Sequence, residues 1–292
     1  MTRPMTFDKP TTETICAVLG CAPADIRGIE PMKEGLTNNS YEFSVSGIRY
    51  VCRIPGDGTD DIISRESEAF SESVAKELGL DDAMIYISAE TGLKISRYVE
   101  NYSYPDPYDE NDRILAMKTI RVLHDSKVRS AWDFDYMTET DRILALDCFT
   151  ADADMEIHGR MKAVNSRLAG MGYETHLCHN DAWNYNMLKT PDGRITLIDW
   201  EYSGNAYPAA DVAYFTASLD YSDDDYIHLA ELYEGHALSE AEKWYYFAVM
   251  AIVMWYWYIW ALYEEILGTR VDDKNLWLDK ALRALERAEE KK

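Results

Sequence analysis

One stretch near the middle of the chain carries the residues best suited to chemistry. It reads His179-Asn180-Asp181-Ala182-Trp183-Asn184-Tyr185-Asn186, and a second acid, Asp199, follows shortly after it. Phosphoryl transfer needs a carboxylate that receives the acceptor hydroxyl and hard oxygen ligands that hold Mg²⁺ on the phosphates. Asp181, Asn186 and Asp199 supply these groups in that order, so their types and spacing predict phosphoryl transfer.

The segment between Asn186 and Asp199 predicts a hairpin that would position both metal ligands. Two short extended runs, 187–189 and 194–198, are joined by the turn Pro191-Asp192-Gly193. In this interpretation Asp181 is the general base, while Asn186 and Asp199 bind the metal that offsets charge on the phosphate oxygens. A polar loop capped by an aspartate is the alternative. The combination of spacing and hairpin favours the catalytic interpretation.

The hydrophobic patterns predict two parts, with a boundary at residues 99 and 100. The first part, 1–99, is mainly strands, expected at 27–33, 41–46, 48–54, 84–88 and 93–99, with one helix at 62–78. The second part, 100–292, opens on a linker rich in Pro, Tyr and Asp and is then largely helical. Its helices are expected at 112–126, 140–149, 154–169 and from Pro208 onward.

The first part also offers candidate nucleotide-binding residues. The loop from Gly35 to Ser40, which includes Leu36, Thr37, Asn38 and Asn39, could present backbone N–H groups to phosphates. It holds one glycine, so an ordinary hairpin loop is equally consistent with it. Arg53, on the third strand, could grip phosphate oxygens with its guanidinium, and Glu66 on the following helix could orient it. Taken alone, both could be surface charges.

A late apolar stretch, 244–262, predicts a buried helix with a candidate cation site. Trp255 and Tyr258 lie three residues apart and therefore share a helix face, where their rings could attract an ammonium group. Aromatic residues at this spacing are also typical of an ordinary core. A membrane span is less favoured, because the aromatics lie through the middle of the segment and not at its ends.

The composition limits the class of partner. The formal net charge of −23 disfavours nucleic acids and anionic membranes, and it would tolerate a small cationic substrate. The five cysteines are odd in number and form no CxxC pair, and the chain opens on no leader pattern, so a cytoplasmic location is expected. The sequence does not indicate the oligomeric state.

Four segments resemble the choline/ethanolamine kinase family, within the aminoglycoside-phosphotransferase-like kinases and closest to the bacterial choline kinases of phosphocholine decoration. They are 34–41, 50–59, Cys178-His179-Asn180-Asp181 and Ile198-Asp199-Trp200-Glu201-Tyr202-Ser203-Gly204. The resemblance implies an α+β, bilobal protein-kinase-like fold, with a small, mainly β N-lobe, a larger helical C-lobe, and ATP and Mg²⁺ between them.

The resemblance also implies residue roles. Asp181 would be the base, Asn186 and Asp199 the metal ligands, and Arg53 the phosphate-binding residue with Glu66 as its partner. Tyr98 and Val99 would contact adenine, and Glu201, Trp255 and Tyr258 would join Asp181 at the substrate. The implied activity is ATP-dependent phosphorylation of a small amino alcohol, choline first. Ethanolamine, an aminoglycoside, thiamine or another hydroxylated amine is the alternative substrate, and a binding module without activity is the alternative class.

Overall fold

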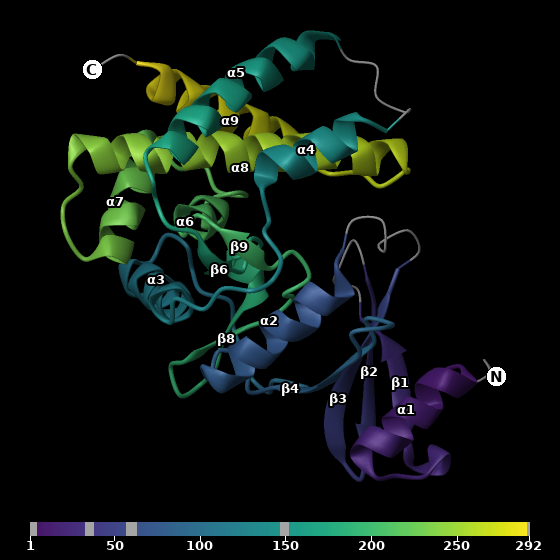
Figure 1. Cartoon of the computed structure of the whole chain (residues 1–292). Helices are drawn as coiled ribbons and strands as arrows, with labels where there is room; N and C mark the ends of the chain where they lie inside the picture. The colour runs from purple at the N-terminus through teal and green to yellow at the C-terminus, as the bar shows by residue number, and fades with distance from the viewer. Residues whose placement is uncertain (1–4, 33–37, 57–62, 147–151, 291–292) are drawn as a thin grey trace. The chain divides into compact units, whose positions relative to one another are not determined.

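A computed structural model describes residues 5–32, 38–56, 63–146 and 152–290. The chain divides into two compact units (Figure 1). Unit 1 comprises residues 1–103 and 188–202, and unit 2 comprises 104–187 and 203–292. The second segment of unit 1 contains Asp199, and it bonds to the first segment where Leu197 N donates to Leu80 O at 2.8 Å.

Unit 1 is built on a five-stranded antiparallel sheet with the strand order β1-β2-β3-β5-β4. Its elements are α1 (Lys9–Leu19), η1 (Pro23–Asp25), β1 (Arg27–Pro31), β2 (Asn38–Val45), β3 (Ile48–Pro55), α2 (Arg65–Glu77), β4 (Met84–Ile87) and β5 (Lys94–Arg97). The five predicted strands are therefore present, with ends that differ by a few residues.

Helix α1 covers one face of this sheet, and the sequence prediction missed it. Ile15 of α1 packs in one apolar core with Phe43, Cys52 and Ile95 of the strands. The signals for the helix are local: the Asp8 carboxylate accepts from Thr11 N at 2.9 Å at its start, and Gly20 ends it in the left-handed conformation.

Helix α2 binds the opposite face through charged groups. Cys52 pairs with Ile95 across β3 and β5, and the next pair is Arg53 with Lys94. Because successive side chains of a strand point to opposite faces, Arg53 and Lys94 lie on the face away from the apolar core. Both side chains are buried there, and both contact carboxylates of α2.

The predicted pairing of Arg53 with Glu66 is wrong. The Arg53 guanidinium instead donates to the carboxylate of Glu68, which is fully buried, while Glu66 is exposed. Residues 65, 68 and 72 are spaced three and four apart and face the sheet together. Glu66 lies about 200° around the helix from Glu68, since each residue turns the chain by about 100°.

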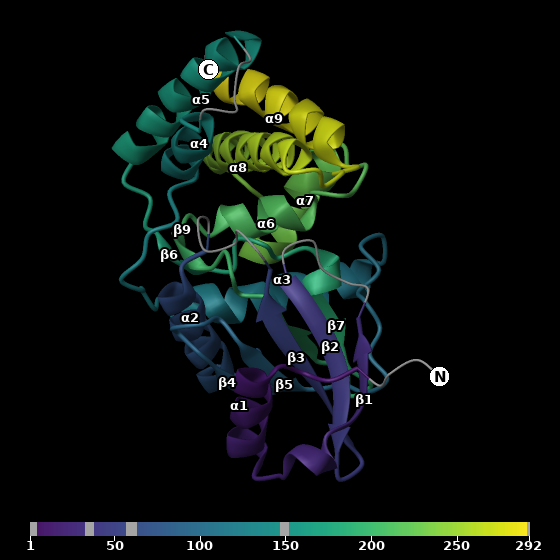
Figure 2. The ribbon, with the colours of Figure 1, turned by 90° about the vertical axis from the view of Figure 1, so that its right-hand side faces the viewer.

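Unit 2 is mainly helical and is arranged around one long helix, α8 (Glu240–Ile266). Helices α4, α5, α6, α7 and α9 pack on α8, and Figures 1 and 2 both show α4, α5 and α9 beside it. The other helices are α3 (Glu110–Asp125), α4 (Tyr136–Leu144), α5 (Asp152–Gly170), α6 (Ala209–Phe215), α7 (Asp223–Glu234) and α9 (Lys274–Glu289). Pro208 precedes α6 as its N-cap, one position before the one expected.

Short strands frame the loop at 179–186. They are β6 (His176–Cys178) paired antiparallel with β9 (Gly204–Ala206), and β7 (Met187–Lys189) paired with β8 (Ile195–Leu197). The hairpin predicted between Asn186 and Asp199 is present as β7–β8. Strand β9 was not predicted, because its three residues carry no alternating apolar pattern.

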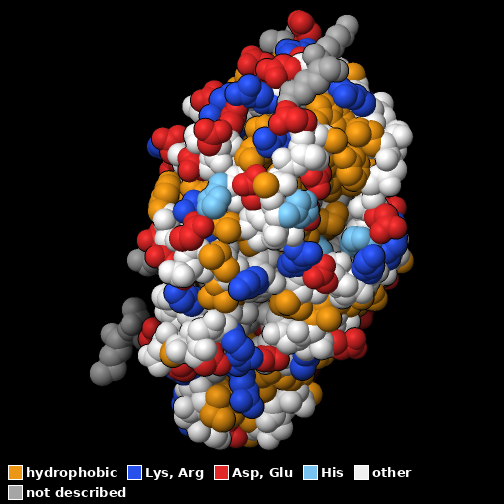
Figure 3. All heavy atoms as spheres, turned by 90° about the vertical axis from the view of Figure 1, so that its left-hand side faces the viewer, with side chains coloured by type: hydrophobic (Ala, Val, Ile, Leu, Met, Phe, Trp, Pro, Cys, Tyr) orange, Lys and Arg blue, Asp and Glu red, His pale blue; other side chains and the backbone are white. Residues whose placement is uncertain are grey.

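The apolar helix α8 and the surface charge both bear on which partners the protein could bind. Helix α8 is long and apolar enough to cross a membrane, but 89% of its most apolar window is buried inside the protein, as in the core helix of a globular unit. On the face drawn in Figure 3, acidic and basic side chains are interspersed, so the negative charge does not gather in one acidic patch on this face.

The contact between Arg53 and Glu68 of α2 can be tested by substitution. Glu68→Gln should destabilise the protein by on the order of 3 kcal/mol, because it removes a charged partner from a buried guanidinium. Glu66→Gln is the matched control on the same helix turn, and should change stability by less than about 0.5 kcal/mol. Urea unfolding followed by circular dichroism measures both. Equal effects of the two substitutions would contradict the assignment of Glu68 as the partner.

Candidate active site

A buried acid holds the loop that carries Asp181. Asp211, at the start of α6, accepts from His179 N at 2.9 Å and from Asn180 N at 2.6 Å. His124 of α3 bonds to the same carboxylate at 2.9 Å and to the Tyr233 hydroxyl at 2.8 Å. Burial opposes ionisation of Asp211, but the bonds from His124 and His179 outweigh it, so its pKa lies below its ordinary value. The loop is therefore fixed by an ionised carboxylate.

The loop conformation places Asp181 beside Asn186. Asn180 has a φ of 64°, a left-handed conformation uncommon outside glycine and frequent at functional sites. A short turn, η3 (Asn184–Asn186), then returns the chain. Asn186 Nδ2 donates to both the backbone oxygen and Oδ2 of Asp181, at 2.9 and 2.8 Å. Because the amide nitrogen faces Asp181, the amide oxygen of Asn186 is left to accept or to ligate.

One aromatic side chain, Tyr214, contacts the Asp181 carboxylate, and further rings pack behind it. Burial, followed by the charge of Asp181 and a hydrogen bond to it, raises the pKa of Tyr214 well above its ordinary value. The Tyr214 ring stacks on Trp257 of α8 at a centroid distance of 4.5 Å, and Trp257 contacts Trp260 at 5.3 Å and Trp277 of α9 at 6.1 Å. We call Tyr214, Trp257, Trp260 and Trp277 the aromatic cluster.

Trp255 and Tyr258 do not join this cluster. Their rings lie 5.5 Å apart, as their spacing predicts, but they face α5. Trp255 is fully buried, and its indole N–H donates to His158 Nδ1 at 3.1 Å. Trp257 is two residues later and therefore points about 200° away, toward α6 and α9. The structure thus brings Trp257, which the sequence prediction left out, to the side of α8 that faces Asp181.

A second group of charged residues lies within unit 1. Arg53 Nη1 donates to Asp199 Oδ1 at 2.8 Å and lies 3.9 Å from Glu201 Oε2. Glu201 is buried and accepts from Asn38 Nδ2 at 2.7 Å. Burial opposes the charge of Arg53, but Glu68, Asp199 and Glu201 outweigh it and raise its pKa. Arg53 therefore stays cationic and ties α2 to the segment that carries Asp199.

Asp199 is held in an unusual backbone conformation. Its φ is 67°, and a non-glycine residue adopts this value at a cost that the surroundings must meet. The preceding hairpin supplies that support, because Leu197 N bonds to Leu80 O and the buried Trp200 indole donates to Leu197 O at 3.1 Å. The side chain of Asp199 is 31% exposed. One carboxylate oxygen faces Arg53, and the group is open enough to bind a further cation.

Carboxylates outnumber cations in this group. Among the described residues, ion pairs connect two cations to three carboxylates: Arg53 and Arg65 with Glu68, Asp199 and Glu201. We call these five residues the charge cluster. Its formal charge leaves one negative charge in excess, so a further cation beside Asp199 would be favoured. Carboxylate oxygens are also the ligands that Mg²⁺ prefers.

The other predicted nucleotide-binding residues belong to unit 1. Tyr98 and Val99 come directly after β5 and are half-buried, and the Arg49 guanidinium lies 3.6 Å from the centre of the Tyr98 ring. Asn38 and Asn39 open β2. Gly35, Leu36 and Thr37 lie outside the described residues.

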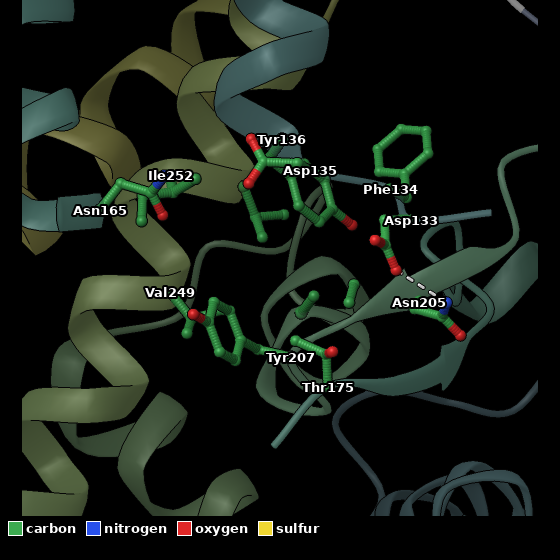
Figure 4. A pocket seen from close by; sticks show the side chains of 13 residues that line it. Asp133, Phe134, Asp135, Tyr136, Asn165, Thr175, Asn205, Tyr207, Val249 and Ile252 are labelled. Atoms are coloured by element: carbon green, nitrogen blue, oxygen red, sulfur yellow. Dashed lines mark hydrogen bonds between the residues drawn. The ribbon is translucent and has the colours of Figure 1, made fainter. Parts of the chain in front are cut away.

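Two other features of unit 2 contain none of the predicted site residues. His124, Cys178 and Asp211 place potential metal ligands within 4.8 Å of one another, but burial raises the pKa of the Cys178 thiol, and Asp211 already binds the loop amides. A pocket of about 190 Å³ lies beside α8 (Figure 4). Its lining includes Asp133, which Figure 4 shows bonded to Asn205.

Known proteins match both the sequence and the fold. A family model for choline/ethanolamine kinase matches residues 115–263, more than half of the 292-residue chain. Protein LicA of Haemophilus influenzae is 30% identical over 189 residues, which cover 61% of this chain but only 55% of that protein.

Two crystal structures share the fold at low identity. Choline kinase LicA from Streptococcus pneumoniae superposes with a TM-score of 0.76 at 21% identity, covering 96% of this chain and 98% of that one. A structure of LicA in complex with AMP superposes with a TM-score of 0.75 at 21% identity, covering 98% and 99%. The predicted fold class, a protein-kinase-like fold with a mainly β N-terminal region and a helical C-terminal region, is confirmed. The chain belongs to the choline/ethanolamine kinase family.

Proposed function

We propose that this protein transfers the γ-phosphoryl group of ATP to the hydroxyl of a small amino alcohol, choline first. The observation that carries the proposal is the contact between the Asp181 carboxylate and the aromatic cluster through Tyr214. A carboxylate can accept the proton of an alcohol, and ring faces attract a quaternary ammonium group. The two ends of choline require these two kinds of group, a few atoms apart.

Asp181 would act as the general base. It would accept a hydrogen bond from the substrate hydroxyl, orient the oxygen toward the γ-phosphate and take up the proton as the new P–O bond forms. The bond from Asn186 Nδ2 to Asp181 Oδ2 fixes one carboxylate oxygen, at 2.8 Å, and so limits the rotation of the base. Asp211 holds the loop in the conformation that this role requires.

Arg53, Asn186 and Asp199 would handle the nucleotide phosphates. Arg53 is cationic and already oriented by Glu68, so its guanidinium can bind phosphate oxygens without first losing side-chain freedom. Mg²⁺ would be held by the carboxylate of Asp199 and the amide oxygen of Asn186, and it would offset the charge of the phosphates. LicA, which shares this fold, has a crystal structure in complex with AMP, and this supports a nucleotide as the phosphoryl donor.

Choline would be selected by the aromatic cluster. Trp257, Trp260 and Trp277 come from two helices and contact one another through their rings. Each ring that faces an ammonium group contributes about 0.5–2 kcal/mol. Ethanolamine is the nearest competitor, since a solved structure of this fold is an ethanolamine kinase from Plasmodium vivax.

The reaction is tested by measuring ADP release with ATP, Mg²⁺ and a panel of choline, ethanolamine, thiamine and an aminoglycoside. Choline should give the highest kcat/KM. Asp181→Asn should lower kcat by about 10³-fold or more, because an amide cannot accept the proton, and should leave ATP binding unchanged. Near-normal turnover in this variant would exclude Asp181 as the base, and no turnover of any amine by the wild-type protein would exclude the kinase assignment.

A second experiment tests which face of α8 binds the ammonium group of the substrate. Trp257→Leu should raise the KM for choline about tenfold, through loss of a cation–π contact, with a smaller effect on the KM for ATP. Trp255→Leu is the matched control, since it removes an equally buried indole from the same helix. Steady-state kinetics with choline as the varied substrate separates them, once thermal melting shows both variants folded. A larger KM increase in the Trp255 variant would instead assign the cation site to the face that carries Trp255 and Tyr258.

A further inference from the structure

A second buried cation lies beside Arg53, and the proposed function gives it no role. Lys94 of β5 is the direct cross-strand partner of Arg53 on β3, and both side chains lie on the sheet face that α2 covers. Like charges directly opposite each other across two strands are destabilising. A leucine or methionine at position 94 would pack on this face without that cost. The presence of a lysine here therefore calls for a physical reason.

Two carboxylates of α2 are spaced so that each pairs with one of the two cations on the strands. Glu68 and Glu72 are four residues apart, lie on one face of the helix and are both fully buried. Arg53 pairs with Glu68, and Lys94 pairs with Glu72. Lys94 Nζ also lies 3.4 Å from Asp81 Oδ2, and the other oxygen of Asp81 accepts from Ala83 N and Met84 N at 3.0 and 3.1 Å. Lys94 is thus fixed from two sides.

Without Lys94, Glu72 could pair with Arg53. Glu72 lies one turn of α2 from Glu68, which binds Arg53, and its own partner Lys94 is the cross-strand neighbour of Arg53, so Glu72 lies close to Arg53. Glu72 Oε2 and Arg53 Nε are both buried, and neither has a hydrogen-bond partner among the described residues. This acceptor and this donor carry opposite charges and lie between α2 and the sheet without pairing. Lys94 binds the other oxygen of Glu72.

We propose that Lys94 is a positioning residue for nucleotide binding: by binding Glu72 it keeps this carboxylate from competing with phosphate for Arg53. The inference rests on the proposed role of Arg53 in phosphate binding. Its physical basis is that a guanidinium shared between two buried carboxylates has less charge and fewer free N–H donors to offer to a third anion. With Glu72 occupied, Arg53 binds Glu68 through Nη2, and its Nη1 remains directed toward Asp199 and Glu201.

The test is a rescue experiment with four variants, read out as the affinity for ADP with Mg²⁺ by titration calorimetry. Lys94→Met should weaken binding about tenfold, the size expected for coupling between groups in contact. The double variant Lys94→Met/Glu72→Gln should return to within about twofold of the wild type, because the competing charge is gone. Glu72→Gln alone and Lys94→Arg should both bind nearly as the wild-type protein does.

A purely structural lysine would behave differently. Lys280→Met is the control, because Lys280 is also buried and donates to the backbone oxygens of Thr216 and Leu219 within unit 2. It should lower the free energy of unfolding without weakening ADP binding. If Lys94→Met does not fold, Lys94→Ala, which likewise offers no side-chain donor to Glu72, replaces it in the same comparison.

Two results would overturn the role of Lys94 alone: wild-type affinity in the Lys94→Met variant, or a double variant that binds as weakly as that single variant. A wild-type protein that binds no nucleotide would overturn the proposed function as well. Nucleotide binding needs no knowledge of which amine is phosphorylated, so this measurement separates the two failures.

Discussion

The buried guanidinium of Arg53 is the contact on which the architecture of unit 1 depends. It joins three segments that are distant in sequence, because it lies on β3, binds Glu68 of α2 and donates to Asp199 at the end of the β7–β8 hairpin. Taking a charge out of water costs several kcal/mol, so an arginine here is tolerated only with carboxylates on both sides. The carboxylates in turn exceed the cations within the charge cluster, and this excess would favour a further cation beside Asp199.

In unit 2, a buried carboxylate fixes the backbone of a loop. Asp211 is fully buried and ionised, and its oxygens bind the backbone amides of His179 and Asn180 and the ring of His124. It therefore fixes the shape of the loop that carries Asp181. The strained backbone at Asn180 and at Asp199 occurs beside these two supports, which is where stored strain can be borne.

Parts of the site were predictable because they depend on local spacing. Asp181, Asn186 and Asp199 follow from a motif and a hairpin that fold as the sequence indicates, and Arg53 follows from its place on the third strand. Glu66, whose predicted pairing is wrong, and Trp255, which lies on the other face of α8 from the aromatic cluster, each lie on a helix whose orientation is set by tertiary packing. Glu68 and Trp257 are only two residues away, but the rotation between i and i+2 moves a side chain to a nearly opposite face.

Other misses had different causes. Helix α1 carried its own start and stop signals, Asp8 and Gly20, so it could have been found by reading caps before strand patterns. Strand β9 could not, because three residues paired with β6 leave no period in the sequence. The pairing of Arg53 opposite Lys94 also required the strand register, which no local pattern specifies.

If the excess carboxylate charge around Arg53 serves a divalent cation, metal binding must depend on the carboxylate of Asp199. Electron paramagnetic resonance of Mn²⁺, titrated into the protein with ADP, measures this most directly because bound Mn²⁺ loses its free-ion signal. We expect tight binding in the wild-type protein and a loss of at least about tenfold in Asp199→Asn. Asp192→Asn, in the exposed turn of the same hairpin, should bind as the wild type does. Equal Mn²⁺ affinity in the Asp199→Asn variant and the wild-type protein would exclude Asp199 as a metal ligand.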